Sequence, residues 1–199
     1  MASTMRQMQK TRTRGVLIAA ALAHFAQDGL SAARTADIAA SAGVSHGTVF
    51  VHFPTREDLM TAAIEELGAR VTRRMHELAE TGNGVSDLLE AHLRGLTEFE
   101  PFYARLIMEE SVLPPRAKNT LVMIQSSISF HLSLAVDREI AAGMIRNIPF
   151  HLLFNTWIGL LHYYLVHAAA FAPGQSVLKR HGRELLEHYL VLISNEQEE

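Results

Sequence analysis

Residues 34–59, RTADIAASAGVSHGTVFVHFPTREDL, decide the fold that this chain is predicted to adopt. Thr35 is expected to cap a short helix, because its hydroxyl can accept a hydrogen bond from a free N–H of the first turn. Gly43 then supplies a sharp turn, since glycine adopts left-handed backbone angles at little steric cost. Ser45 should cap a second short helix, which Pro54 stops. Two short helices joined by a tight turn are the pattern of a helix-turn-helix.

The second helix, at about residues 46–52, has few large apolar side chains and therefore buries little surface by itself. A short, exposed helix of this kind suits the major groove of DNA, where its N-terminal residues would lie against base edges. Thr55 and Asp58 have the spacing of a capping box, so a third helix should begin near Arg56. The segment therefore predicts a DNA-binding domain.

The motif at residues 37–59, DIA followed by AGVSHGTVF and HFPTREDL, resembles the DNA-binding domain of the TetR (tetracycline-repressor) family of bacterial regulators. Residues 16–30 are similar to the first helix of that family, so the resemblance covers roughly residues 11–65. Two positions depart from the family pattern. Phe50 stands where Tyr is usual, which removes a hydroxyl that would reach a phosphate. His46 stands where a small or basic residue is common, and we expect it to help set the operator preference.

The resemblance implies an all-α fold with about nine helices, three in an N-terminal helix-turn-helix domain and six in a C-terminal helical domain for ligand binding and dimerisation. Helical periodicity along nearly the whole chain agrees with this fold class. We place the DNA-binding domain at residues 1–55 and the effector-binding and dimerisation domain at residues 56–199. Members of the family are usually homodimers, in which the last two long helices of each subunit form a four-helix bundle.

Local signals predict where several helices begin and end. The first ten residues are expected to fray, and a first helix should run from about Thr13 to Gln27. The helix that begins near Arg56 should continue to about Glu80, before a break at residues 81–84. Residues 148–172 are apolar and long enough to cross a bilayer, but they include three histidines and an asparagine, and no second span follows. A buried or dimer-forming helix is therefore preferred there, with no membrane as partner.

Composition limits the classes of function. The 199 residues are 48% hydrophobic, which is enough for a full core. The absence of cysteine excludes disulfides, thiolate metal sites and cysteine nucleophiles. Residues 1–57 carry a net charge of +3 and the remainder −6, so a basic segment precedes an acidic body, as a DNA-facing domain requires. A solvated basic tail is the alternative. The polar N-terminus has no apolar signal core, which favours a cytoplasmic protein.

Matching the family motif residue by residue assigns the DNA contacts. Thr48 and His46 are the expected base or phosphate contacts, and Gly47 would let the backbone approach closely. His52 and Phe50 should lie against the sugar-phosphate backbone. The full set of predicted DNA-binding residues is Arg12, Arg14, Thr35, Ser45, His46, Gly47, Thr48, Phe50, His52 and Arg56.

The other members of this set would contact the DNA backbone. Thr35 lies at a predicted helix N-terminus and can offer its hydroxyl and amide to a phosphate. Arg56, at the start of the long helix, should also reach a phosphate. Arg12 and Arg14 would enter an adjacent minor groove or follow the backbone.

A small-molecule effector inside the body is implied by the family. Aromatic and methionine side chains make an adaptable apolar lining, so we expect an apolar or aromatic effector. The candidate lining residues are Phe99, Phe102, Met108, Met123, Phe130, His151, Phe154, Asn155, Trp157 and His162. For any one of them, ordinary core packing is the preferred alternative.

Eleven histidines raise the question of a metal or haem. His151, Asn155 and His162 share one helix face, because their spacings are close to whole turns. The two imidazoles would lie about 16 Å apart along the axis, so one ion would need ligands from another helix. We therefore predict no metal and no cofactor, and prefer histidines that are hydrogen-bonded in the core or at the dimer interface.

No catalytic motif supports an enzyme, since the sequence has no nucleophile elbow, glycine-rich phosphate loop or His-Glu-x-x-His pattern. The primary hypothesis is a homodimeric transcription regulator, most often a repressor in the family, that a small molecule releases from a palindromic operator. The alternative hypothesis is a metal- or ligand-sensing helical protein in which DNA binding is secondary or lost.

Overall fold

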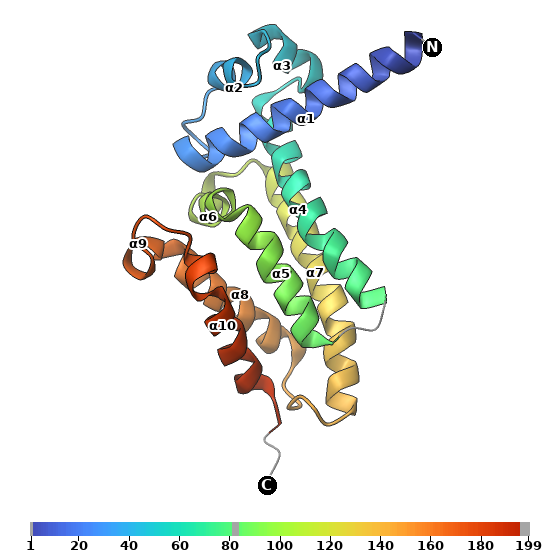
Figure 1. The fold of residues 1–199 in the computed structure, drawn as a ribbon, viewed down its shortest axis with the longest axis vertical. Helices are drawn as coiled ribbons and strands as arrows, with labels where there is room; N and C mark the ends of the chain where they lie inside the picture. Colours follow the sequence, from blue (N-terminus) through green and yellow to red (C-terminus); the bar gives the residue numbers. More distant parts are fainter. Residues whose placement is uncertain (1, 81–83, 196–199) are drawn as a thin grey trace. The chain divides into compact units, whose positions relative to one another are not determined.

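The computed structural model describes residues 2–80 and 84–195, and these residues are almost entirely helical (Figure 1). An isolated bridge between Ile145 and Ser194 is the only strand-like pairing found within those two ranges. The prediction of an all-α fold is confirmed. The described part contains ten α-helices rather than about nine, because a four-residue helix at Ala168–Phe171 was not anticipated.

The helices follow one another with short connections. Their bounds are α1 Ala2–Asp28, α2 Thr35–Ser41, α3 His46–His52, α4 Arg56–Glu80, α5 Val85–Glu98, α6 Glu100–Met108, the 3₁₀ helix η1 Glu110–Val112, α7 Pro115–Ala141, α8 Phe150–Val166, α9 Ala168–Phe171 and α10 Val177–Ile193. The predicted bounds of α3 and α4 are confirmed. The predicted break at residues 81–84 falls largely outside the described residues, and Gly84 is the N-cap of α5.

The chain forms two compact units. Unit 1 comprises Met1–Leu67 and Pro101–Val122, and unit 2 comprises Gly68–Glu100 and Met123–Glu199. Helices α4 and α7 therefore contribute residues to both units. The predicted boundary after residue 55 was drawn between a DNA-binding and an effector-binding domain, and it does not coincide with a boundary between the two units. The assignment of the two functions stays a prediction.

Helix α1 begins much earlier than predicted, at Ala2 rather than near Thr13. The expectation that the first ten residues fray is wrong for the described ones. Residues 2–14 contain neither proline nor glycine and are rich in good helix formers, so nothing local stops the helix there. On the C-terminal half of α1, Leu17 and Phe25 are fully buried, whereas Val16 is 43% exposed.

In the core of unit 1, α1 packs against α2 of the helix-turn-helix and contacts α6. Phe25 of α1 stacks on Phe102 of α6 with ring centroids 6.2 Å apart. Ile38 of α2 and Val49 of α3 are buried in the same unit, and so is Phe53, which follows α3. These apolar anchors fix α3 through one face and leave its other face exposed.

The core of unit 2 is built from α5, α8 and α10, and Trp157 of α8 is fully buried in it. The Trp157 ring lies 5.2 Å from the Tyr189 ring, and the Tyr189 hydroxyl donates to the Leu153 carbonyl at 2.7 Å. Burial raises the pKa of Tyr189. A Cβ on Gly182 would lie 3.1 Å from the Leu93 side chain, so glycine there lets α10 approach α5 closely.

The N-terminus of α10 is capped by two oxygen-bearing side chains of unit 2. The Ser176 hydroxyl accepts from the Lys179 N–H at 3.0 Å and so caps the helix. The buried Glu100 carboxylate accepts from the Val177 N–H at 2.8 Å and the Leu178 N–H at 3.1 Å. A carboxylate in this position satisfies free N–H groups and complements the helix dipole.

In the part of the chain that the structure describes, no helix has both the length and the apolarity to cross a membrane. The apolar stretch that we considered as a span forms α8 and α9, and the preference for a buried helix agrees with the burial of Leu153, Trp157 and Leu161.

Candidate nucleic-acid interface

The turn between α2 and α3 has the predicted geometry. Gly43 has φ 67°, in the left-handed region that favours glycine. The Val44 N–H donates to the Ala39 carbonyl at 3.0 Å and closes the end of α2. Ser45 then caps α3, because its hydroxyl accepts from the Thr48 N–H at 3.2 Å. The predicted roles of Gly43 and Ser45 in the fold are confirmed.

The exposed face of α3 holds small and polar residues together with Phe50. His46 and Gly47 are exposed, Thr48 is half-buried, and Phe50 is 43% exposed. A Cβ on Gly47 would lie 3.9 Å from the nearest heavy atom, the Ser45 hydroxyl oxygen, which is an ordinary contact. No packing contact within the described chain therefore requires glycine at this position. Without a side chain at Gly47, another molecule can approach the backbone of α3 closely.

Thr35 does not cap α2, so that prediction is wrong. The N-cap is Arg34, without a side-chain hydrogen bond, and Thr35 is the first helical residue. The Thr35 hydroxyl instead lies 2.9 Å from Nε2 of His46, and the His46 ring meets the Phe50 ring edge-on at 5.1 Å. A threonine side chain of α2 therefore orients the first residue of α3, a tertiary role that spacing alone does not reveal.

Arg14 and Arg56 each lie over an aromatic ring of unit 1. The Arg14 guanidinium lies 5.0 Å from the centre of the Phe53 ring. The Arg56 guanidinium lies 5.7 Å from the Phe25 ring, donates to the Ala33 carbonyl at 3.2 and 3.3 Å, and also donates to the Leu30 carbonyl. Arg56 thus ties the start of α4 to the loop between α1 and α2. A phosphate contact by Arg56 stays a prediction, and it would compete with these bonds.

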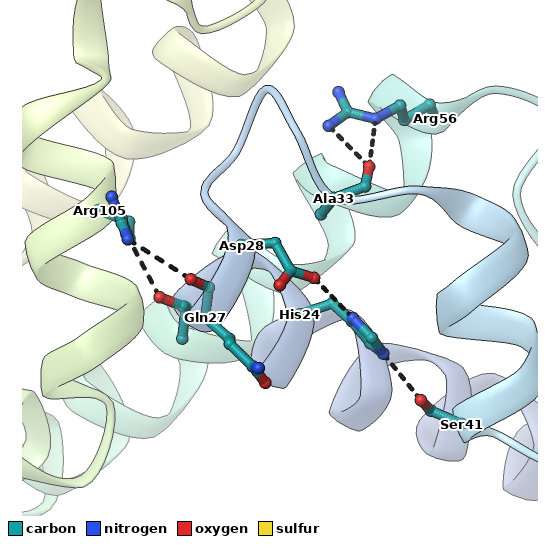
Figure 2. A network of polar contacts seen from close by, with 8 residues as sticks. His24, Gln27, Asp28, Ala33, Ser41, Arg56 and Arg105 are labelled. Carbon is teal, nitrogen blue, oxygen red and sulfur yellow. Dashed lines mark hydrogen bonds and ion pairs between the residues drawn. The ribbon is translucent and has the colours of Figure 1, made fainter.

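Figure 2 shows polar contacts that hold this loop and the end of α1 in place. His24 of α1 bridges Asp28, at 2.8 Å, and the Ser41 hydroxyl of α2, at 2.7 Å. Arg105 of α6 donates to the Ala26 and Gln27 carbonyls at 3.3 and 3.4 Å, where the free carbonyls of α1 attract a cation. Sequence reasoning missed both residues, because their partners are 17 and more than 70 positions away.

Glu109 completes the support of the same loop. Its carboxylate accepts from the Ser31 N–H at 3.2 Å. A Cβ on Gly29 would lie 2.8 Å from a Glu109 carboxylate oxygen, and Gly29 has φ 90°. Glycine is therefore needed at the end of α1 both for its backbone angle and for the approach of Glu109. The sequence shows that Arg105 and Glu109 are four residues apart, which is the spacing of one helix face. It does not show that both side chains bind backbone groups between Ala26 and Ser31.

An open groove of about 620 Å³ lies between the N-terminal half of α1 and α3. Arg6, Lys10 and Thr13 line it from α1. Thr48, Val51 and His52 line it from α3. Burial and the nearby Lys10 and Arg14 cations lower the pKa of His52 below its usual range. Thr48 and His52 belong to the predicted DNA-binding set. They line the same groove as Arg6 and Lys10, two cations that the set did not include.

None of the ten residues proposed for an effector site lines any of the three hollows described here. Phe102 is buried against Phe25, and Trp157 is fully buried, with its Nε1 donating to Nδ1 of His92 at 3.0 Å. Met108, Met123 and Phe130 are 47%, 73% and 60% exposed. The core alternative holds for Phe102 and Trp157.

The remaining candidates are spread over other surfaces of unit 2. His151 and Asn155 are exposed, whereas Phe99, Phe154 and His162 are half-buried. The two hollows described in this unit, of about 120 and 130 Å³, are lined by other side chains, including Leu78, Glu90, Leu152 and Leu192. The effector site stays a prediction.

His92 is a buried polar residue that sequence reasoning did not single out. Its side chain accepts from Trp157, and burial together with nearby His162 lowers the pKa of His92 to about 4. Within residues 2–80 and 84–195, no three side chains of His, Asp or Glu are placed to hold a metal ion together. His92 therefore acts as a neutral hydrogen-bond acceptor in the core.

Comparisons with known proteins agree with this geometry. Residues 17–63, which span the C-terminal part of α1, the helix-turn-helix and the start of α4, match the family model for bacterial regulatory proteins of the tetR family. The HTH-type transcriptional regulator CymR of Pseudomonas putida is 35% identical over 153 residues, which cover 75% of this chain and 65% of CymR. This chain belongs to the TetR family.

Another relative matches over a shorter stretch of the chain. The HTH-type transcriptional repressor Rv3405c of Mycobacterium tuberculosis is 41% identical over 63 residues, 32% of this chain. The match spans about a third, 34%, of that relative's length.

Solved TetR structures show the same fold over most of the chain. PfmR of Thermus thermophilus superposes with a TM-score of 0.73 at 17% identity, covering 88% of this chain and 97% of PfmR. FadR of Bacillus subtilis, in complex with stearoyl-CoA, gives a TM-score of 0.69 at 17% identity, covering 88% of this chain and 96% of FadR. At this identity the likeness shows the fold alone.

Proposed function

We propose that this chain is a sequence-specific DNA-binding transcriptional regulator of the TetR family. The observation that carries the proposal is α3, which is anchored by the buried Val49 and Phe53 and exposes His46 and Gly47. A helix held in this way can enter a major groove without losing core contacts. The names of CymR and Rv3405c, both HTH-type transcription proteins, support the same function.

In this proposal the residues of α3 have separate roles. Thr48 and His46 contact base edges or phosphates, and Gly47 allows a close backbone approach. Phe50 and His52 lie against the sugar-phosphate backbone. Ser45 is occupied as the cap of α3, so its contribution to DNA binding is mainly to orient Thr48.

The proposed assembly is a homodimer formed through α8 and α10. Both helices expose apolar side chains, which are Leu152, Tyr163 and Val166 on α8 and Val191 and Leu192 on α10, each at least 43% exposed. Contiguous apolar surface of this kind is typical of interaction sites. A homodimer would bind two half-sites of a palindrome, because its own symmetry is twofold.

The proposed control is a repressor that an apolar or aromatic small molecule releases from DNA. The FadR structure was solved with stearoyl-CoA, which supports an apolar ligand class for the fold. By linkage, an effector that prefers the conformation without DNA lowers operator affinity by the same factor as DNA lowers effector affinity. We place this regulation in the cytoplasm and propose no enzymatic activity.

The experiment that tests the function is selection of bound DNA from a random pool, followed by binding of the winning sequence across a salt series. An enriched palindrome bound with a Kd of roughly 10⁻⁸ M or lower at physiological salt supports the regulator. Weak, salt-sensitive binding without enrichment contradicts it and favours the alternative of a ligand- or metal-sensing protein.

The dimer is tested separately by sedimentation. Val191→Glu places a charge on the proposed interface, since Val191 is 74% exposed in the single chain, and should yield monomers. Val112→Glu, at a 60% exposed position in η1, is the control and should leave the sedimentation coefficient unchanged. Equal behaviour of the two variants would contradict an interface at α10.

A further inference from the structure

Helix α1 extends further toward its N-terminus than the packing of unit 1 requires. Residues 5–12 are all exposed, and the buried side chains of α1 begin at Leu17. Exposed helix of this kind gains little from tertiary packing, which is the main source of helix stability in proteins. The packing of the helix-turn-helix therefore does not explain these turns.

The chemistry of one helix face changes along α1. Thr13, Lys10 and Arg6 precede Leu17 by four, seven and eleven residues, so all three lie within roughly 40° of Leu17 around the axis. The face is apolar and buried at Leu17, and it is cationic and exposed at Lys10 and Arg6. The two cations therefore continue the inward-facing side of α1 beyond the protein core.

These cations line the groove of about 620 Å³ described above, opposite α3. Gln7 and Gln9 add side-chain amides to the α1 wall, and none of the residues that line the groove is acidic. Figure 1 shows α1 extending past α3 toward its N-terminal end. The hollow is thus bounded by hydrogen-bond donors and positive charge on one side and by the predicted DNA-binding helix on the other.

The surroundings of His52 in this groove disfavour a positive charge on its ring. Burial lowers the pKa of His52, and the nearby Lys10 and Arg14 cations lower it further. Its Nδ1 atom is buried without a hydrogen-bond partner. Cations that line a groove without an acidic neighbour attract an anion into it.

We infer that this groove holds one strand of the sugar-phosphate backbone of bound DNA, with Arg6 and Lys10 donating to its phosphates. The inference rests on the proposed function and extends the DNA interface from α3 to the first turns of α1. We assign the backbone as the occupant, because phosphate and sugar groups take most of the hydrogen bonds at protein–DNA interfaces, and Arg and Lys are common donors to them. Since α3 lines the opposite wall, the strand is one that borders the major groove occupied by α3.

The test compares the full-length protein with Arg6→Ala/Lys10→Ala on the operator selected from a random pool. Arg94→Ala/Arg138→Ala is the matched control, because it removes the same charge from exposed positions of α5 and α7, outside the helix-turn-helix and the proposed dimer helices. Affinity is measured by fluorescence anisotropy over a salt series. The groove variant should lose on the order of tenfold in affinity, and its salt slope should fall by about one for each phosphate that it no longer neutralises. The control should stay within about twofold of the unchanged protein.

Ethylation interference then locates the phosphates. For the unchanged protein, ethylation of specific phosphates next to each half-site should inhibit binding, and this effect should disappear for Arg6→Ala/Lys10→Ala. Arg6→Lys/Lys10→Arg keeps both charges and should recover most of the affinity. The preferred operator sequence should be the same for all variants, because phosphate contacts carry no direct sequence information.

The possible failures are distinguishable. If the unchanged protein binds its operator tightly and the groove variant binds equally well with the same salt slope, the inference is overturned and the proposed function stands. If the unchanged protein selects no operator, both are overturned. Circular dichroism checks that the variant keeps its helix content.

Discussion

The helix-turn-helix and helix α8 both held predicted functional residues, but the two regions place them differently. On α3, His46 and Gly47 are exposed and the apolar Val49 is buried. On α8, Trp157 is fully buried in the core while His151 is exposed. A polar or aromatic residue in the sequence therefore indicates a binding site only where the fold leaves its side chain exposed. Variants in the two regions should therefore differ in whether they change stability or DNA binding.

The largest effect is expected at Trp157, the only tryptophan of the chain. Trp157→Ala removes a fully buried ring and leaves the acceptor on His92 unpaired, so the free energy of unfolding should fall by about 3–5 kcal/mol. Urea denaturation followed by circular dichroism measures this change. Phe130→Ala, another predicted pocket residue but 60% exposed, should change stability by less than about 0.5 kcal/mol. If both variants lost a similar amount of stability, Trp157 could not be assigned to the core and Phe130 to the surface.

The second effect is the acid sensitivity of the same core. The pKa of His92 is about 4 in the folded protein, compared with 6.5 for an ordinary histidine. Between pH 6.5 and about 4 the unfolded chain therefore binds a proton that the folded chain does not. Stability should fall with pH in this window, by at most about 3 kcal/mol from His92 alone.

Urea unfolding at pH 7, 6 and 5, followed by the fluorescence of Trp157, measures this dependence. His92→Gln keeps an acceptor for Trp157 but cannot titrate, so its stability should depend less steeply on pH. Parallel curves for His92→Gln and the unchanged protein would show that His92 is not the group responsible.

The sequence could predict α3 because its signals are local. The Ser45 cap, the Gly43 turn and the capping box of Thr55 and Asp58 all act within four residues, and the structure contains each of them. Hydrogen-bonding groups so close in the chain have few alternative partners. The prediction for Thr35 failed for the converse reason, because its hydroxyl pairs with His46, which is eleven residues away and not marked by any local signal.

The contacts of α8 could not be predicted in the same way. Its residues are apolar on nearly every side, so periodicity did not select the buried face. The partner of Trp157 is His92, 65 residues away, and no local pattern connects them. The early start of α1 was missed for a different reason, since exposed polar residues give no periodic signal even where they are good helix formers.

A third prediction concerns DNA binding without loss of stability. Thr48→Ala removes a half-buried hydroxyl but keeps the backbone N–H that Ser45 caps. Operator affinity should fall by about 1–3 kcal/mol, roughly 5- to 150-fold, if Thr48 contacts a base edge. Thermal unfolding should shift little. An unchanged Kd would remove Thr48 from the interface.

A substitution at Gly47 is expected to change stability and DNA binding in opposite directions. The site accommodates a Cβ, and alanine favours helix by about 0.5–1 kcal/mol relative to glycine, so Gly47→Ala should stabilise the protein slightly. The same methyl group would obstruct a close approach to DNA, so operator affinity should fall. A variant that is more stable and binds DNA equally well would show that the backbone does not approach DNA closely at this position.

The smallest effect is expected at Arg12, which was predicted from the sequence as a DNA contact. It lies roughly 120° from Arg6 and 160° from Lys10 around the axis of α1, away from the face that lines the groove. Arg12→Ala should therefore weaken binding to operator and unrelated DNA by a similar small factor and reduce the salt slope by at most about one. Anisotropy with both DNAs measures this. If Arg12→Ala changes the preferred sequence instead, Arg12 contacts bases in the minor groove, and the face of α1 that meets DNA is the one opposite to the groove.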